Sequence, residues 1–126
     1  MTFPKNLKYT DTHEWLEELE DGHVRIGITD YAQDQLGDLV YVNLPEEGDE
    51  VVEYESFADV ESIKAISEVI SPVNGTVVAI NEKLTDTPEA INDTPYEAWF
   101  IEVSDAEVPD DLMDADEYQA FVESKE

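Results

Sequence analysis

The sequence predicts a small, mainly β domain, a flattened β-sandwich or barrel with helices only at its margins. Short runs rich in β-branched and aromatic residues recur along the chain. Turn-forming Gly, Pro and Asn residues separate these runs at close spacing, and only two short segments show helical periodicity. With 126 residues, the chain has room for one domain with its own core, so we expect a single layered β structure.

The first two expected strands form a hairpin. Residues 13–17 are strand-like, and the turn that follows them contains Gly22, a residue that tolerates positive φ. In the next run, 23–28, every second residue is apolar. This alternation places one face of the second strand in the core.

A short helix is expected near residues 30–36. Thr29 or Asp30 can act as its N-cap, because either side chain can accept a hydrogen bond from a free backbone N–H in the first turn. Gly37 suits the position just after the helix, where a left-handed backbone is common.

The rest of the chain is expected to alternate strands with turns. The further strands are predicted at 38–44, 51–52, 56–61, 66–70, 76–80 and 99–103. Residues 81–96 are expected to form a loop with one helical turn near 89–91. A C-terminal helix is predicted near 114–124, with Asp114 as its N-cap and an apolar stripe along one side.

The charge of the chain is strongly negative, −27, from 33 acidic and 6 basic residues. The acids are spread along the sequence, which indicates an acidic shell around an ordinary core. Because such a shell repels itself unless salt screens it, we infer a salt-rich cytoplasm, as in a halophile; an acidic protein from a mesophile is the alternative. Nucleic acid is not an expected partner, because phosphate binding needs clustered Lys and Arg.

Other classes of site are disfavoured by what the sequence lacks. No apolar run is long enough to span a membrane, and the N-terminus lacks the apolar core of a signal peptide, so a cytoplasmic protein without a membrane partner is expected. The absence of cysteine excludes disulfides and thiolate ligands. His13 and His23 make a poor metal site by spacing alone, so no metal is expected.

Lys64 is the most informative residue for function. It is the only lysine or arginine between residues 26 and 82, in a stretch crowded with Asp and Glu, and it lies at the expected turn between two strands. The small neighbours Ser62 and Ala65 leave its amine open to a modifying enzyme. We therefore interpret Lys64 as a covalent attachment point; a solvated lysine without a role is the alternative.

Several motifs stand in a fixed order along the chain. They are His13–Trp15, Ile26–Gln33, Leu36–Asp38, Leu44–Pro45, Val60–Ala65, Ser71–Gly75 and Pro95–Trp99. In this combination they resemble the H protein of the glycine cleavage system, and the resemblance covers roughly residues 7–124. It implies a lipoyl-domain-like fold, a hybrid barrel-sandwich, in a single carrier domain over 1–126. The lipoyl-like core would span about 23–104, with a C-terminal helical segment at about 109–124.

The resemblance also implies a function. Lipoic acid would be amide-linked to Lys64, and the arm would carry the aminomethyl group of glycine from glycine decarboxylase (P protein) to aminomethyltransferase (T protein). Dihydrolipoyl dehydrogenase (L protein) would then reoxidise it. The chain itself would be a non-catalytic carrier. A lipoate ligase or lipoyl transferase would attach the arm, and Glu61, Ser62 and Ala65 are candidates for its recognition.

The loaded arm is implied to fold back into a surface cleft. Thr12, His13 and Glu14 are candidates for one side of that cleft, with Glu68 opposite. A carboxylate there would pair with the cationic end of the arm. The alternative is that Glu14 and Glu68 are two of many solvated acids.

Other functions remain open from the residues alone. The runner-up is a lipoyl or biotinyl domain of another swinging-arm complex, although biotinyl lysines usually lie between methionines and here the neighbours are Ile63 and Ala65. A structural adaptor with an acidic face would leave Lys64 unmodified. An enzyme is the least supported, because no nucleophile and base occur at a recognisable spacing.

Overall fold

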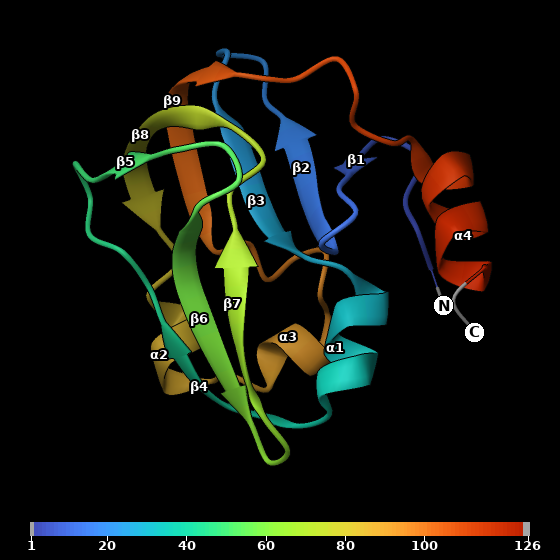
Figure 1. The fold of residues 1–126 in the computed structure, drawn as a ribbon. Coiled ribbons are helices and arrows are strands. Elements are labelled where there is room, and N and C mark those ends of the chain that lie inside the picture. Colours follow the sequence, from blue (N-terminus) through green and yellow to red (C-terminus); the bar gives the residue numbers. More distant parts are fainter. Residues whose placement is uncertain (1, 125–126) are drawn as a thin grey trace.

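The structure, a computed structural model, describes residues 2–124 and confirms a mainly β sandwich of two antiparallel sheets (Figure 1). Residues 1, 125 and 126 of the expected domain lie outside the described residues. The six-stranded sheet has the order β1 (Lys8–Tyr9), β2 (Glu14–Glu18), β3 (Val24–Ile28), β9 (Ile101–Glu107), β8 (Asn74–Ile80) and β5 (Glu50–Val51). The three-stranded sheet has the order β4 (Leu39–Asn43), β6 (Ser56–Ser62) and β7 (Ile66–Ile70).

The sandwich core forms because alternate residues of each strand point to the same face. From the smaller sheet, Val60 and Val69 are buried, and from the larger sheet Ile26, Val77 and Val103 are buried in the same cluster. The two sheets thus cover each other's apolar faces and form a stiff platform.

Helix α1 (Asp30–Leu36) connects the two sheets and is bounded as the sequence predicts. The Thr29 side chain accepts a hydrogen bond from the backbone N–H of Ala32, and the helix ends at Gly37, whose φ is +81°. Thr29 rather than Asp30 is therefore the N-cap. The partly buried Ala32 and Leu36 pack against the sandwich core.

A second apolar cluster joins the C-terminal helix α4 (Ala115–Glu123) to the edge of the larger sheet. The rings of Tyr9 and Tyr118 stack with centroids 4.8 Å apart, and Trp15 is buried beside them. Asp114 and Glu117 form a reciprocal capping box at the start of α4. No helix among residues 2–124 is long and apolar enough to cross a membrane.

Three expectations need correction. The expected loop 81–96 contains two one-turn helices, α2 (Lys83–Asp86) and α3 (Ala90–Asp93), where only the second was anticipated. Leu84 of α2 is fully buried in the core, and this burial supports a turn too short for sequence periodicity to detect.

The last strand was also placed too early. It was expected at 99–103, but β9 runs from Ile101 to Glu107, because β8 pairs with it along most of its length and β3 pairs with its first half. β8 likewise begins at Asn74, two residues before the expected start. In both cases pairing with neighbours set the strand ends.

Candidate functional site

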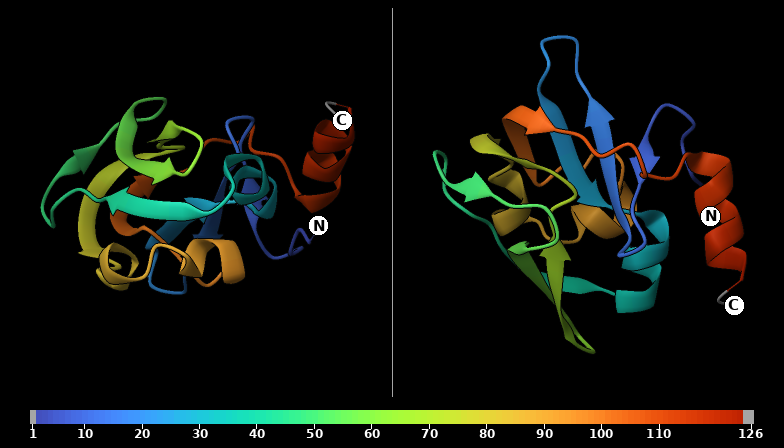
Figure 2. Two further views of the ribbon diagram at one scale, coloured as in Figure 1. Left: turned by 90° about the horizontal axis from the view of Figure 1, so that it is seen from below. Right: turned by 45° about the horizontal axis from the view of Figure 1, so that its top comes forward.

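Lys64 lies at the tip of the β6–β7 hairpin, which extends beyond the neighbouring elements (Figures 1 and 2). The last strand pair joins Glu61 to Ile66, and Ser62 closes the turn. The backbone N–H of Ser62 donates to the Ala65 carbonyl at 2.8 Å, and the Ser62 hydroxyl accepts from the N–H groups of Lys64 and Ala65, each at 3.1 Å. The turn is thus held by its own residues and presents the lysine side chain outward.

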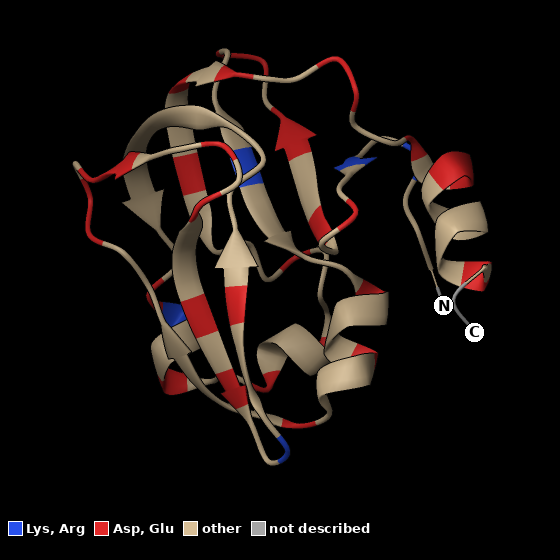
Figure 3. Ribbon diagram, viewed as in Figure 1, with Lys and Arg blue, Asp and Glu red and all other residues tan. Residues whose placement is uncertain are grey.

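The Lys64 side chain is exposed and rests against the end of α1. Its Nζ lies 3.4 Å from the carbonyl oxygen of Gln35, one of the carbonyls at the C-terminus of the helix. That end carries partial negative charge and attracts an ammonium group. Figure 3 shows this lysine as the one basic position at the hairpin tip, with acidic residues on both adjoining strands.

One face of β7 leads away from Lys64. Ile66, Glu68 and Ile70 alternate along this face, while Val69 is buried on the opposite side of the strand. At about 3.3 Å per residue, Glu68 lies roughly 7 Å along β7 from Ile66, where the strand begins after the turn, and Ile70 roughly 13 Å. Asp59 pairs across from Glu68 on β6, so two carboxylates stand side by side on this face.

Glu14 lies at the far end of that face and is buried, with 2% of its surface exposed. One carboxylate oxygen, Oε1, accepts hydrogen bonds from the hydroxyls of Thr10, at 2.7 Å, and Thr12. The other oxygen accepts from the backbone N–H of Ile70 at 3.4 Å. Desolvation by burial raises the pKa of Glu14 to about 7, although these three hydrogen bonds pull the pKa down.

Glu14 opens onto a cavity of about 260 Å³. The wall combines apolar and acidic groups, and it includes Thr12, Ile70, Pro72, Leu112, Phe121, Tyr54, Asp11 and Asp111. The cavity therefore has an apolar interior with a carboxyl group held at its wall by fixed donors. Such a cavity suits a chain that is apolar along its length and positively charged at its end.

The structure brings only two of the four predicted arm-cleft residues into this cavity. Thr12 and Glu14 line it. His13 lies outside the lining, with Nδ1 2.7 Å from the Tyr118 hydroxyl and its ring against Tyr31. Glu68 also lies outside it, on the exposed face that runs toward Lys64.

The sequence analysis did not identify several of the residues that line the cavity. Ile70 could have been found from its alternation with Glu68 along the expected strand. Tyr54, which has a φ of +71°, comes from the loop after β5, and Leu112 comes from the segment before α4. Only the folded chain brings these two segments to Glu14.

A stiff β-sandwich that presents one accessible lysine on an isolated hairpin, with a cavity one strand length away, defines a swinging-arm carrier domain. The family model described as "Glycine cleavage H-protein" matches residues 7–125 of the chain. The chain belongs to the glycine cleavage H-protein family.

Similar proteins agree with this assignment. The chain is 54% identical over 121 residues to the glycine cleavage system H protein of Lachnoclostridium phytofermentans, covering 96% of this chain and 95% of that protein. It is 50% identical over 123 residues to the probable glycine cleavage system H protein of Pyrococcus abyssi, covering 95% and 92%. The crystal structure of a glycine cleavage system H protein from Mycobacterium marinum superposes with a TM-score of 0.87 at 40% identity, covering 94% and 97%.

The family determines the role of the chain. It is the lipoyl carrier of the glycine cleavage system, and its partners there are the P, T and L proteins. It is a non-catalytic subunit, since the chemistry is performed by those partners. A biotinyl carrier, an adaptor and an independent enzyme are therefore set aside.

Proposed function

We propose that Lys64 is the residue that bears the lipoyl group. The observation that carries this proposal is the exposed amine at the β6–β7 turn. Lys8, by contrast, pairs with Glu18 at 2.7 Å on the sheet edge, and Lys83 lies in α2. An amide bond to the arm needs a free amine that an enzyme can surround, and a hairpin tip gives that access.

When bound, lipoic acid supplies a disulfide that accepts the aminomethyl group and is later restored by oxidation of the dithiol. The chain has no cysteine to supply such a group itself. Its contribution is a rigid base and a local tether, which together raise the effective concentration of the cargo at each partner's site.

We propose that Glu14 holds the cationic end of the arm in the cavity. Thr10 and Thr12 aim their hydroxyls at one oxygen of Glu14, so the carboxylate is oriented before any ligand enters. An ammonium group beside Glu14 would stabilise its ionised form and offset the cost of burial. Apolar residues such as Ile70 and Leu112 would keep water from the labile cargo.

Glu68 has a different proposed role, on the path rather than in the cavity. With Asp59 across from it, Glu68 places negative charge along the face between Lys64 and Ile70. Because both carboxylates are accessible to water, their attraction for the arm is weak and reversible. Such a path guides the arm without retaining it.

For attachment of the arm, we propose that a lipoate ligase or lipoyl transferase recognises the hairpin around Lys64. Ser62 and Ala65 fix the turn that presents the amine. Glu61 pairs with Ile66 and, on its other side, with Tyr41, so it is the acidic residue beside the turn. The modifying enzyme would therefore recognise the shape of the hairpin turn and the carboxylate of Glu61.

Mass spectrometry of the protein from its native host tests the attachment site. The expected result is one lipoyl group on the peptide that contains Lys64. Modification of Lys83 or Lys8 instead, or no modification in cells that grow on glycine, contradicts the proposal.

The lifetime of the aminomethyl cargo tests the cavity. Glu14→Ala should shorten the lifetime on the isolated carrier at least tenfold, because the cationic end loses its partner. Glu68→Ala is the matched control and should shorten it less than twofold. Equal lifetimes in the wild-type protein and Glu14→Ala would rule out the role of Glu14.

We also propose that the acidic surface is an adaptation to high salt. Of the 33 acidic residues, Glu14 is the one that is buried among those described, so nearly all of the negative charge faces solvent. The free energy of unfolding should rise as KCl increases from low to molar concentration, as screening removes the repulsion. A flat or falling dependence contradicts this adaptation.

A further inference from the structure

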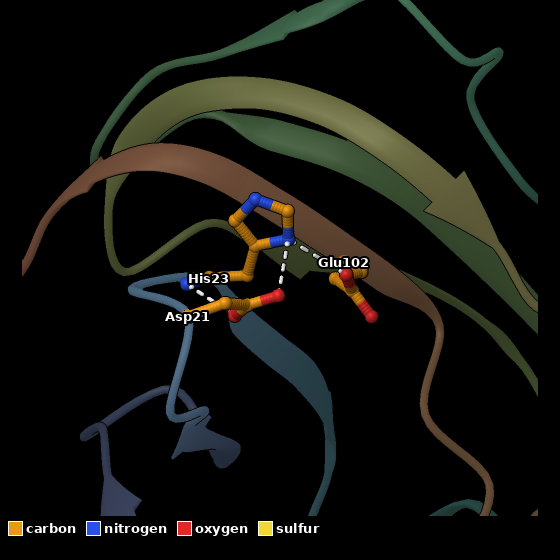
Figure 4. A group of neighbouring side chains, drawn as sticks. All are labelled: Asp21, His23 and Glu102. Atoms are coloured by element: carbon orange, nitrogen blue, oxygen red, sulfur yellow. Dashed lines mark hydrogen bonds and ion pairs between the residues drawn. The ribbon is translucent and has the colours of Figure 1, made fainter.

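A cluster of three side chains lies far from Lys64 in the sequence and is not used by the carrier function. Asp21 is in the turn between β2 and β3, His23 lies just before β3, and Glu102 lies on β9 (Figure 4). Figure 4 shows His23 Nδ1 directed at both carboxylates. Nδ1 is 2.8 Å from Glu102 Oε2 and 3.4 Å from Asp21 Oδ2.

We propose that Asp21, His23 and Glu102 form a binding site for one divalent transition metal ion of the zinc class. Each residue offers one ligand atom, and the three atoms all lie within 4.8 Å of one another. Two ligands held at about 2.0–2.1 Å by a tetrahedral zinc ion are separated by roughly 3.3 Å. The Asp21–His23 separation already meets this value, and the His23–Glu102 separation needs to open by about 0.5 Å.

The two better-buried ligands are placed by paired strands, since Glu102 lies on β9 and His23 immediately precedes β3. Arg25 and Glu102 are partners in the β3–β9 ladder, so His23 and Glu102 are held close by backbone hydrogen bonds. Asp21 is oriented by the backbone N–H of His23, which donates to its Oδ1 at 3.0 Å and leaves Oδ2 facing the imidazole. The ligand oxygens of Asp21 and Glu102 lie within 4.8 Å of each other and would close by up to about 1.5 Å, so binding requires side-chain shifts of that order.

Arg25 orients the third ligand. Its Nε donates to Glu102 Oε1 at 3.1 Å, and its guanidinium is stacked 4.7 Å from the Trp99 ring. This contact leaves Oε2 of Glu102 for the metal and fixes its direction, as supporting hydrogen bonds do in natural metal sites. Asp105 adds a further negative charge that acts on His23, so the local field remains attractive to a cation despite Arg25.

The ligand set selects the type of metal. An imidazole nitrogen with two carboxylate oxygens favours zinc, cobalt or nickel, whereas magnesium and calcium prefer oxygen alone. Asp21 is 60% exposed, so water can complete the coordination. Binding through Nδ1 would leave the proton of the neutral imidazole on Nε2 and tie the β2–β3 turn to β9.

The test is a titration of Zn²⁺, with no other ligand added, at about pH 8, which is above the ordinary pKa of imidazole. Isothermal calorimetry should show one saturable site. In NMR spectra the ring protons of His23 should shift strongly while those of His13 do not. His23→Gln and Glu102→Gln should each weaken binding at least tenfold.

Controls separate this site from general attraction to an acidic surface. Asp34→Asn, which removes one exposed charge on α1, should leave the affinity within twofold of wild type. Mg²⁺ should bind at least tenfold more weakly than Zn²⁺ and leave the His23 resonances unmoved. Equal Zn²⁺ affinity in wild type and His23→Gln, equal affinity for the two metals, or no saturable binding would each overturn the proposal.

Discussion

The hairpin tip and the Glu14 cavity are opposite kinds of site. Lys64 is exposed, and the turn that presents it is closed by hydrogen bonds among its own residues. Glu14 is buried, and its surroundings come from β2, the end of β7 and the segment before α4. This difference suits the two proposed roles, because attachment of the arm requires access, whereas protection of a labile cargo requires exclusion of water.

The two sites also differ in how much a change there affects the stability of the fold. Removal of an exposed side chain at the tip costs little stability, since few contacts are lost. Ionisation of Glu14 works against folding, because burial raises its pKa from 4.5 to about 7. The tip can therefore change with little consequence for the fold, whereas in the cavity the protonation of Glu14 is coupled to the stability of the fold.

Lys64→Arg should have the largest effect of all, and only on function. Arginine keeps the charge but cannot form the amide, so lipoylation should fall to background while the melting temperature changes by less than about 2 °C. Intact-mass measurement after incubation with lipoate, ATP and a lipoate ligase reports this. Lys83→Arg should be modified like wild type. Full modification of Lys64→Arg would mean that the tip is not the attachment site.

Glu14→Gln should change how the free energy of unfolding depends on pH, which distinguishes the buried site from the exposed tip. The folded-state pKa of Glu14 lies above the unfolded-state value, so the stability it contributes is present below about pH 4.5 and is lost as pH rises to about 7. The difference in unfolding free energy between Glu14→Gln and wild type should thus change by about 3 kcal/mol across this window, in favour of the variant. Denaturant unfolding as a function of pH measures it.

The control for that experiment is Glu68→Gln, which removes the same charge from an exposed position on β7. Its unfolding free energy should track that of wild type to within about 0.5 kcal/mol over the same pH range. If the two variants gave the same profile, Glu14 would not be titrating in a buried site.

Thr10→Val should destabilise the cavity without touching the tip. The Thr10 hydroxyl donates to Glu14 Oε1 and accepts from the Glu14 backbone N–H at 3.0 Å, so valine removes the side-chain partner of that N–H and leaves Oε1 with the Thr12 hydroxyl alone. We expect a loss of about 2 kcal/mol in unfolding free energy at neutral pH, with unchanged lipoylation. A loss of lipoylation at 25 °C in the folded variant would show that the two sites are not independent.

Gly37→Ala should have the smallest effect, and it tests whether the contact between α1 and Lys64 orients the lysine. An alanine Cβ there would lie 2.9 Å from Lys64 Cε, on a backbone with φ of +81°. The backbone strain should cost about 1 kcal/mol of unfolding free energy. Gly48→Ala carries a similar strain, with φ of +94°, but nothing lies near its Cβ. A change in lipoylation rate for Gly37→Ala alone would show that the α1 contact orients Lys64.

Much of the fold was predictable because its signals are local. The Thr29 cap, the strand alternation on either side of Lys64 and the Asp114 capping box each depend on residues a few positions apart. Where burial or pairing with distant strands decided the outcome, prediction failed. α2 depends on burial of Leu84, and the extension of β9 depends on its pairing with β8.

The sequence by itself determined the position of Lys64, the residue that we propose as the attachment point, since a lone lysine between two alternating runs needs only its neighbours to form a turn. Tertiary structure alone decided which of the acidic residues is buried. Nothing in the local sequence separates Glu14 from 32 other carboxyl groups, and only packing removes water from one of them. The same holds for His23, because Glu102 reaches it only after β3 and β9 have paired.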